Sequence, residues 1–99
     1  MIRMTEGLKM TDSLYELRKF VLMDLMKMGY EYIAKDKDGS LYAYSRSPIK
    51  KGCAWNFDRA SNIDKFNDIS LVSRIFPDIE WENVEPYRIP CINELERRH

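Results

Sequence analysis

The spacing of apolar residues near the N-terminus predicts one amphipathic helix. Five of them recur at steps of three and four residues: Leu14, Leu17, Val21, Leu25 and Met28. This period places them along one side of an α-helix. Ser13 and Glu16 have the spacing of a capping box, and Gly29 can take the left-handed conformation that ends many helices. We therefore expect a helix over residues 13–28, preceded by a leader at 1–11 that need not be ordered.

Residues 30–58 have the pattern of antiparallel strands. Two stretches rich in tyrosine and small apolar residues, 30–35 and 40–46, flank the sequence Asp-Lys-Asp-Gly at 36–39. The Asp-Gly pair favours the positive φ of a hairpin turn, so these stretches are predicted to form a β-hairpin. Residues 53–58 then alternate large apolar with small or polar side chains, which is the period of a half-buried strand. We expect this third strand to lie antiparallel to the second.

The pattern is less regular after this point. Residues 59–68 are mostly polar and are predicted to form a loop. Residues 69–72 favour a short fourth strand, after which residues 72–76 match one helical turn that a proline ends. Residues 93–98 have the composition of a short terminal helix. The expected fold class is α+β, a single domain in which the N-terminal helix packs on a small three- to four-stranded antiparallel sheet.

The stretch FPDIEWENVEPYRI, residues 76–89, combines large apolar residues, prolines and carboxylates. A small chain needs its aromatic residues to close the core, so Phe76, Ile79 and Trp81 are predicted to plug the open side of the sheet. The prolines restrict φ along an extended path and reduce the entropy lost when the segment docks. We expect the carboxylates to face water. Residues 69–90 are thus interpreted as a strand or turn followed by a proline-containing tail that closes the fold.

The charges of the chain cancel. Sixteen basic residues balance sixteen acidic ones, so the formal net charge is zero. Neutrality argues against a protein whose whole surface binds nucleic acid or membrane, although it is compatible with a local patch. No apolar run reaches the roughly 18–20 residues of a membrane span, and the first residues lack the apolar core of a signal peptide. We expect a cytosolic protein with no membrane partner, in which Cys53 and Cys91 are small buried or half-buried groups.

The sequence offers little catalytic chemistry. Its only histidine is the terminal His99, and it has no glycine-rich phosphate loop, Gly-x-Ser-x-Gly, Cys-x-x-Cys or His-Glu-x-x-His. The cysteines and His99 do not have zinc-ligand spacing. Asp36 and Asp38 resemble the start of a calcium loop, but a hairpin turn explains them better because no later glutamate is in register. We expect a non-enzymatic protein with no catalytic residues, metal or cofactor.

The hairpin segment YEYIAKDKDGSLYAY and the ending FPDIEWENVEPYRI resemble a group of uncharacterised small proteins of bacteriophages and prophages of Gram-positive bacteria. The resemblance covers about residues 28–89, and the ending is its most specific part. This chain has Trp81-Glu82-Asn83 where that group often has Trp-Glu-Asp. The resemblance implies a phage accessory protein in the cytoplasm of a bacterial host, and it carries over no catalytic residues.

Two binding functions remain open. The first is a protein-interaction module that binds an unknown host or phage protein, or a second copy in a homodimer, through apolar residues beyond those that one helix stripe needs. These residues are Phe20, Met23, Met26 and Tyr87. The alternative is a small single-stranded nucleic-acid-binding domain, in which aromatic rings stack on bases and basic groups contact phosphates. Its residues would be Tyr42, Tyr44, Arg46, Lys50 and Lys51.

Overall fold

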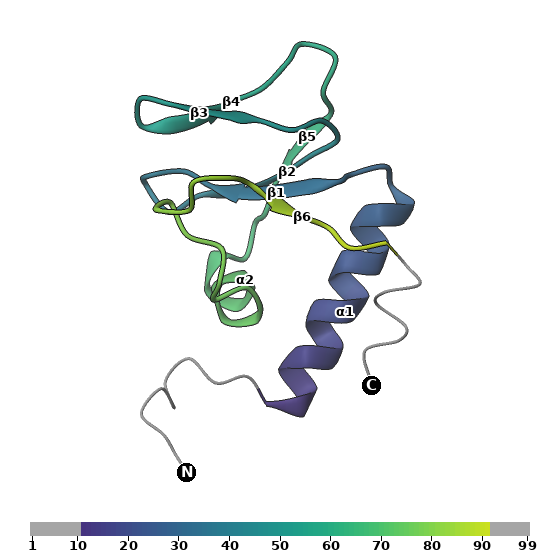
Figure 1. Cartoon of the computed structure of the whole chain (residues 1–99). Coiled ribbons are helices and arrows are strands. Elements are labelled where there is room, and N and C mark those ends of the chain that lie inside the picture. Colours follow the sequence, from purple (N-terminus) through teal and green to yellow (C-terminus); the bar gives the residue numbers. More distant parts are fainter. Residues whose placement is uncertain (1–10, 92–99) are drawn as a thin grey trace.

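The computed structural model describes residues 11–91 of the chain (Figure 1). Its elements, in chain order, are α1 (Asp12–Lys27), β1 (Tyr32–Lys35), β2 (Leu41–Tyr44), β3 (Ile49–Lys51), β4 (Ala54–Asn56), β5 (Ile63–Lys65), α2 (Ile69–Ile75) and β6 (Tyr87–Arg88). The predicted α+β class is confirmed. The predicted leader and terminal helix fall almost wholly outside the described residues. Within the described residues, no helix is long and apolar enough to cross a membrane.

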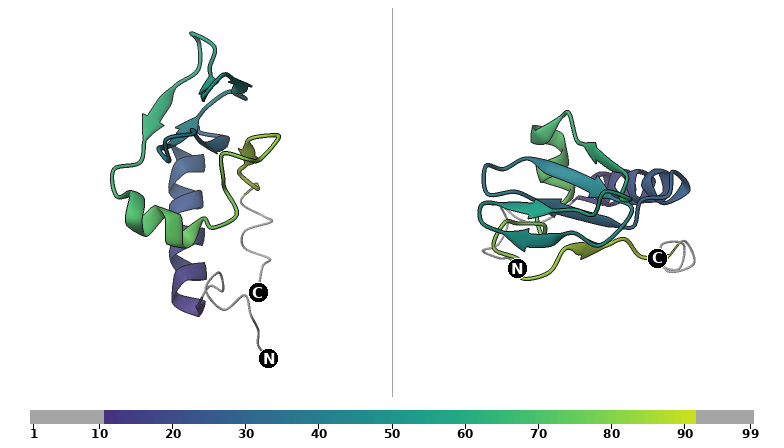
Figure 2. Two further views of the ribbon diagram at one scale, coloured as in Figure 1. Left: turned by 90° about the vertical axis from the view of Figure 1, so that its left-hand side faces the viewer. Right: turned by 90° about the horizontal axis from the view of Figure 1, so that it is seen from above.

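The strands form two antiparallel sheets. Four strands lie in the order β5-β2-β1-β6, and β3 pairs with β4 in a separate two-stranded sheet. The two helices cover one face of the four-stranded sheet, and the β3–β4 hairpin lies over the other face (Figures 1 and 2). The molecule therefore has three layers, with the four-stranded sheet in the middle.

Strand pairing differs from the sequence prediction in two places. The predicted third strand, β4, pairs with β3 and not with the second strand. The neighbour of β2 is instead β5, which lies inside the segment predicted to be a loop. Three residues with one partly buried side chain give too short a signal for alternation to be recognised. The pairing of β5 depends instead on the main chain of β2, because the edge of β2 that does not pair with β1 needs hydrogen-bond partners.

Alternation along β1 and β2 divides the buried side chains into two clusters. Ile33, Leu41 and Ala43 point to the helices and pack with residues of α1, α2 and the segment after α2. We call this set the helix-side cluster. Their neighbours Ala34 and Tyr44 point to the opposite face and pack with Trp55 of β4. Because successive side chains of a strand point to opposite faces, the sheet can be buried on both sides only if a second layer covers each face.

Helix α1 begins at Asp12 with Thr11 as its N-cap, and not at the predicted Ser13. The Thr11 hydroxyl is the N-cap and accepts a hydrogen bond from the Leu14 amide at 3.2 Å. At the other end, Gly29 has φ +94°, as its predicted role in stopping the helix requires. The buried side of the helix is centred on Leu22 and Leu25, so the predicted stripe omitted one core residue. It also included Met28, which is exposed.

The segment after β5 forms a helix, so the prediction of a strand over residues 69–72 is wrong. The predicted helical turn is present in α2, whose N-cap Asp68 accepts from the Leu71 amide. Phe76 and Ile79 are fully buried in the helix-side cluster, whereas Trp81 is only half-buried and packs on the hairpin side. The chain then pairs with β1 through β6, which covers the edge of that strand.

Candidate functional site

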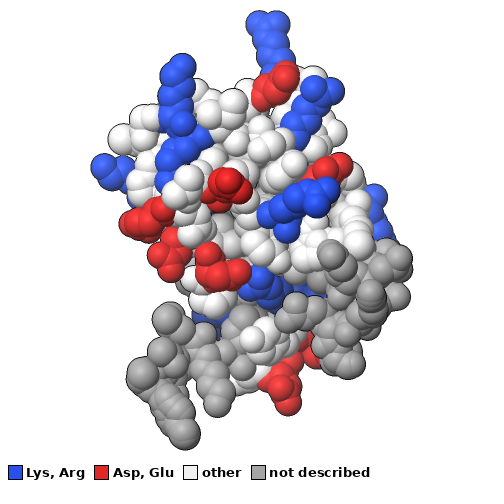
Figure 3. All heavy atoms as spheres, in the orientation of Figure 1, with Lys and Arg blue, Asp and Glu red and all other residues white. Residues whose placement is uncertain are grey.

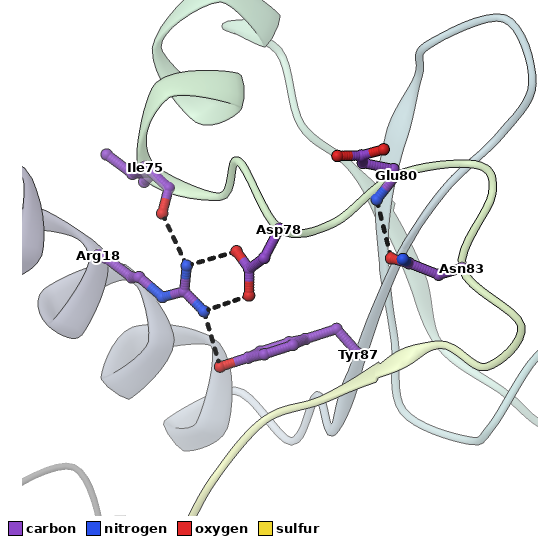
Figure 4. A network of polar contacts seen from close by, with 6 residues as sticks. All are labelled: Arg18, Ile75, Asp78, Glu80, Asn83 and Tyr87. Carbon is purple, nitrogen blue, oxygen red and sulfur yellow. Dashed lines mark hydrogen bonds and ion pairs between the residues drawn. The ribbon is translucent and has the colours of Figure 1, made fainter. Parts of the chain in front are cut away.

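Arg18 connects three parts of the fold that are distant in sequence (Figure 4). Its guanidinium donates to the Asp78 carboxylate at 2.7 and 3.0 Å, to the Ile75 carbonyl at 3.1 Å and to the Tyr87 hydroxyl at 3.2 Å. The guanidinium also lies 5.0 Å from the centre of the Phe76 ring. The two parallel hydrogen bonds to Asp78 fix the orientation of the pair in addition to its charge attraction. The cluster holds α1 against the end of α2 and against β6.

The pKa values of this pair follow from its surroundings. Burial alone would lower the pKa of Arg18, but its hydrogen bonds to Asp78 and Tyr87 outweigh burial and raise it. Burial alone would raise the pKa of Asp78, and the hydrogen bonds and charge of Arg18 lower it below its ordinary value. Both groups are therefore charged at neutral pH. Because both terminal nitrogens of the guanidinium donate to protein oxygens, the pair is explained as a structural clamp.

A second cluster fixes the hairpin to the segment after α2. The ammonium group of Lys50 lies 4.2 Å from the centre of the Trp81 ring and 5.3 Å from that of Trp55. It also donates a hydrogen bond to the Trp81 carbonyl. The two indole rings meet edge to face, 6.5 Å apart. Trp55 is also bonded to the end of β1: its amide donates to the Asp36 carboxylate, and its indole N–H donates to the Lys35 carbonyl, each at 3.0 Å.

The segment between Ile79 and β6 presents a short acidic loop at the surface, residues 80–85. The Asn83 side chain accepts from the Glu80 amide at 2.9 Å (Figure 4), and the Asn83 amide donates to the Glu80 carbonyl at 3.1 Å. Glu80, Glu82 and Glu85 are exposed, and Val84 is 87% exposed. Acidic side chains gather on the side of the molecule where this segment runs (Figures 1 and 3). The acidic loop therefore carries an exposed apolar side chain and three exposed acidic residues within one short segment.

A shallow open groove of about 420 Å³ lies beside the acidic loop. Lys35 and Lys37 line it from the β1–β2 hairpin, and Glu80, Trp81 and Glu82 line it from the segment after α2. Charges of both signs thus border one hollow. Within residues 11–91, no group of three histidine, cysteine or acidic side chains is arranged to hold a metal ion.

The residues predicted to bind a protein partner do not form one exposed surface. Phe20 is 60% exposed on the outer side of α1. Met23, Met26 and Tyr87 are partly buried and pack against the helix-side cluster. Tyr87 also accepts from Arg18, so its hydroxyl has a structural role. Of the four predicted residues, only Phe20 presents most of its side chain to a partner.

The predicted nucleic-acid surface is largely covered. Tyr42 and Tyr44 do point to one face of the sheet, but the β3–β4 hairpin covers that face and leaves Tyr44 only 1% exposed. Lys50 is held between the two tryptophans. Arg46 and Lys51 are exposed, and Arg46 lies 3.7 Å from the Asp58 carboxylate. This arrangement leaves two of the five predicted residues as open contact groups.

Asp36 and Asp38 are turn residues: Asp36 accepts from the Trp55 amide, and Asp38 accepts from the Ser40 amide at 2.9 Å. Cys53 and Cys91 are both exposed, so the expectation that they are buried or half-buried is wrong. Cys53 lies in the tight turn between β3 and β4, directly after Gly52. His99 lies outside the described residues.

Sequence reasoning missed Arg18 and Val84. Arg18 lies between Leu14 and Leu22 on the buried side of α1, and a charged residue at a core position was the available signal. Val84 is the one aliphatic residue between Glu82 and Glu85, but only the structure reveals that it points to solvent.

Comparisons with family models, with curated proteins and with solved structures found no match for this chain.

Proposed function

We propose that the protein is a small, non-enzymatic interaction module that binds a host or phage protein in the bacterial cytoplasm through the acidic loop. The observation that carries the proposal is Val84, which is 87% exposed in the same short loop as the exposed residues Glu80, Glu82 and Glu85. An exposed aliphatic side chain with a polar rim has the composition of a small binding surface. The partner would offer an apolar pocket within a basic surface.

The loop is supported from both sides. Asn83 closes it through two hydrogen bonds with Glu80. Trp81, at its base, packs on Trp55 and is held by Lys50. A loop that already has its bound conformation loses less entropy on binding, which increases affinity without additional contacts. Binding residues are commonly found on loops positioned by a rigid scaffold in this way.

The charge of the acidic loop adds selectivity. The chain as a whole is neutral, so three exposed carboxylates close together create a local negative field. Such a field speeds encounter with a basic partner and disfavours acidic ones, including nucleic acid. The resemblance to small phage proteins supplies the cellular context for a host or phage partner.

The test uses a photocrosslinking amino acid at position 84 in the tagged protein, expressed in a Gram-positive host with and without phage infection. The matched control carries the same amino acid in place of Ile49, which is 71% exposed on the hairpin. We expect a defined protein adduct from position 84 that survives nuclease treatment. The adduct should disappear when Glu80, Glu82 and Glu85 are all changed to glutamine.

Three results would contradict the proposal. The first is the same adduct from both positions, which would indicate nonspecific contact. The second is no adduct from position 84 in either cell state. The third is loss of all captured material on nuclease treatment, which would favour the exposed basic groups Arg46 and Lys51 and a nucleic-acid partner. A circular dichroism spectrum for each variant establishes that the fold is retained.

A further inference from the structure

The outer side of α1 carries a line of four residues that are self-complementary. Glu16, Phe20, Met23 and Lys27 follow one another at steps of four, three and four residues, which keeps them on one side of the helix. Glu16, Phe20 and Lys27 are exposed, and Met23 is partly buried. We call this line the α1 seam. Two apolar residues form its centre, and opposite charges form its ends.

The ends of the α1 seam are available for pairing. Among residues 11–91, neither Glu16 nor Lys27 takes part in either of the two ion pairs, which involve Arg18 with Asp78 and Arg46 with Asp58. Phe20 lies between these two residues along the helix, and 60% of its surface is exposed. Most of its ring is therefore not used for packing within the molecule. Large exposed aromatic side chains at the centre of a polar rim are enriched in protein interfaces.

We propose that the α1 seam binds the same seam of a second copy, with the two helices antiparallel. In one register of that arrangement, Phe20 of each copy packs against Met23 of the other. In an antiparallel pair, the residue number rises along one helix as it falls along the other, so all facing pairs have the same sum of residue numbers. Because 20 and 23 have the same sum as 16 and 27, Glu16 of each copy then faces Lys27 of the other. Antiparallel helices pair core positions in this alternating way, so one register satisfies all four positions.

The charge pattern selects this orientation. A parallel pair would place Glu16 beside Glu16 and Lys27 beside Lys27, and like charges at facing positions repel. The antiparallel pair replaces these with two attractive contacts related by the two-fold axis. Isologous contacts of this kind are typical of homodimers. Charge complementarity therefore favours a second copy over an unrelated helix.

The dimer is expected to be weak and dependent on protein concentration. Four residues from each copy are far fewer than the roughly 20–30 residues a side of a standard stable interface. The α1 seam also shares no residue with the acidic loop, whose segment runs on the left of Figure 1 while α1 lies on the right. The dimer is thus independent of the proposed function, and each can fail without the other.

Sedimentation velocity of the full chain over a wide concentration range tests the proposal. We expect a reversible monomer–dimer equilibrium. Glu16→Lys and Lys27→Glu should each weaken it about tenfold, since each converts two attractive contacts into two repulsive ones. The double variant Glu16→Lys/Lys27→Glu restores opposite charges and should return the dissociation constant to within about threefold of the original. Phe20→Ser should abolish the dimer.

Lys51→Glu provides a matched control, because it reverses an exposed charge on β3, away from α1. It should leave the dimer unchanged. A chain that is monomeric at every concentration would overturn the proposal, and so would a dimer that persists in both single charge variants. Failure of the double variant to recover, while each variant keeps its helical circular dichroism signal, would exclude the antiparallel register.

Discussion

The guanidinium of Arg18 and the carboxylate of Asp78 form a two-point ion pair at 2.7 and 3.0 Å, although 60 positions separate them in the chain. One partner lies on α1, and the other lies in the turn that follows α2. The same guanidinium bonds Tyr87 at the start of β6. A single side chain therefore fastens the helical layer to the strand that covers the edge of β1.

Replacing Arg18 with methionine should destabilise the protein by about 2–3 kcal/mol. The change keeps much of the apolar stem but leaves the Ile75 carbonyl, the Asp78 carboxylate and the Tyr87 hydroxyl without their shared donor. Urea unfolding measures the loss. Arg18→Lys keeps the charge without the fork and should cost less. Equal costs for the two variants would show that the charge contributes nothing without the fork-shaped geometry.

The ion pair should make stability depend on acid. Arg18 lowers the pKa of Asp78 below its ordinary value of 3.8, so the unfolded chain binds a proton at this site more readily than the folded chain. The contribution is therefore present above about pH 4 and is lost as pH falls through the lowered value. Asp78→Asn should reduce the slope of urea midpoint against pH in that range. An unchanged slope would contradict this account.

Tyr44 should make the protein less stable at high pH, whereas the ion pair lowers its stability at low pH. Burial raises its pKa above the ordinary 10.0, and the charges of Asp36 and Tyr42 raise it further. The unfolded chain loses this proton first, so stability is complete below pH 10 and falls as pH rises beyond it. Tyr44→Phe should remove part of that fall and change stability at neutral pH by no more than about 1 kcal/mol. Thermal unfolding between pH 8 and 11 compares the two proteins.

Removing the Trp81 side chain should cost about 2–3 kcal/mol, less than for a fully buried tryptophan, because Trp81 is only half-buried. Trp81→Ala removes the edge-to-face contact with Trp55 and one wall around the Lys50 ammonium. Chemical unfolding followed by the remaining tryptophan measures the loss. Glu82→Ala is the matched control, and should change stability by less than about 0.5 kcal/mol because its side chain is exposed. Equal effects would argue against a packing role.

Local patterns in the sequence determined the elements whose signals lie within a few residues. The three- and four-residue spacing along α1 and the positive φ of Gly29 depend on near neighbours, as does the β1–β2 turn, where Gly39 has φ +95°. The short helical turn before Pro77 was predictable for the same reason. Backbone sterics and side-chain period are properties of the chain itself, and they do not require knowledge of what packs against it.

The tertiary structure decided which faces are covered. Alternation places Tyr42 and Tyr44 on one side of β2, but only the folding of β3 and β4 over that side makes Tyr44 a core residue. The positions of Arg18 and Lys50 were equally dependent on partners from distant parts of the chain. Many long-range pairings are possible for one chain, and each has its own entropy cost of loop closure. Which of them forms depends on the whole chain, so a short stretch of sequence cannot predict it.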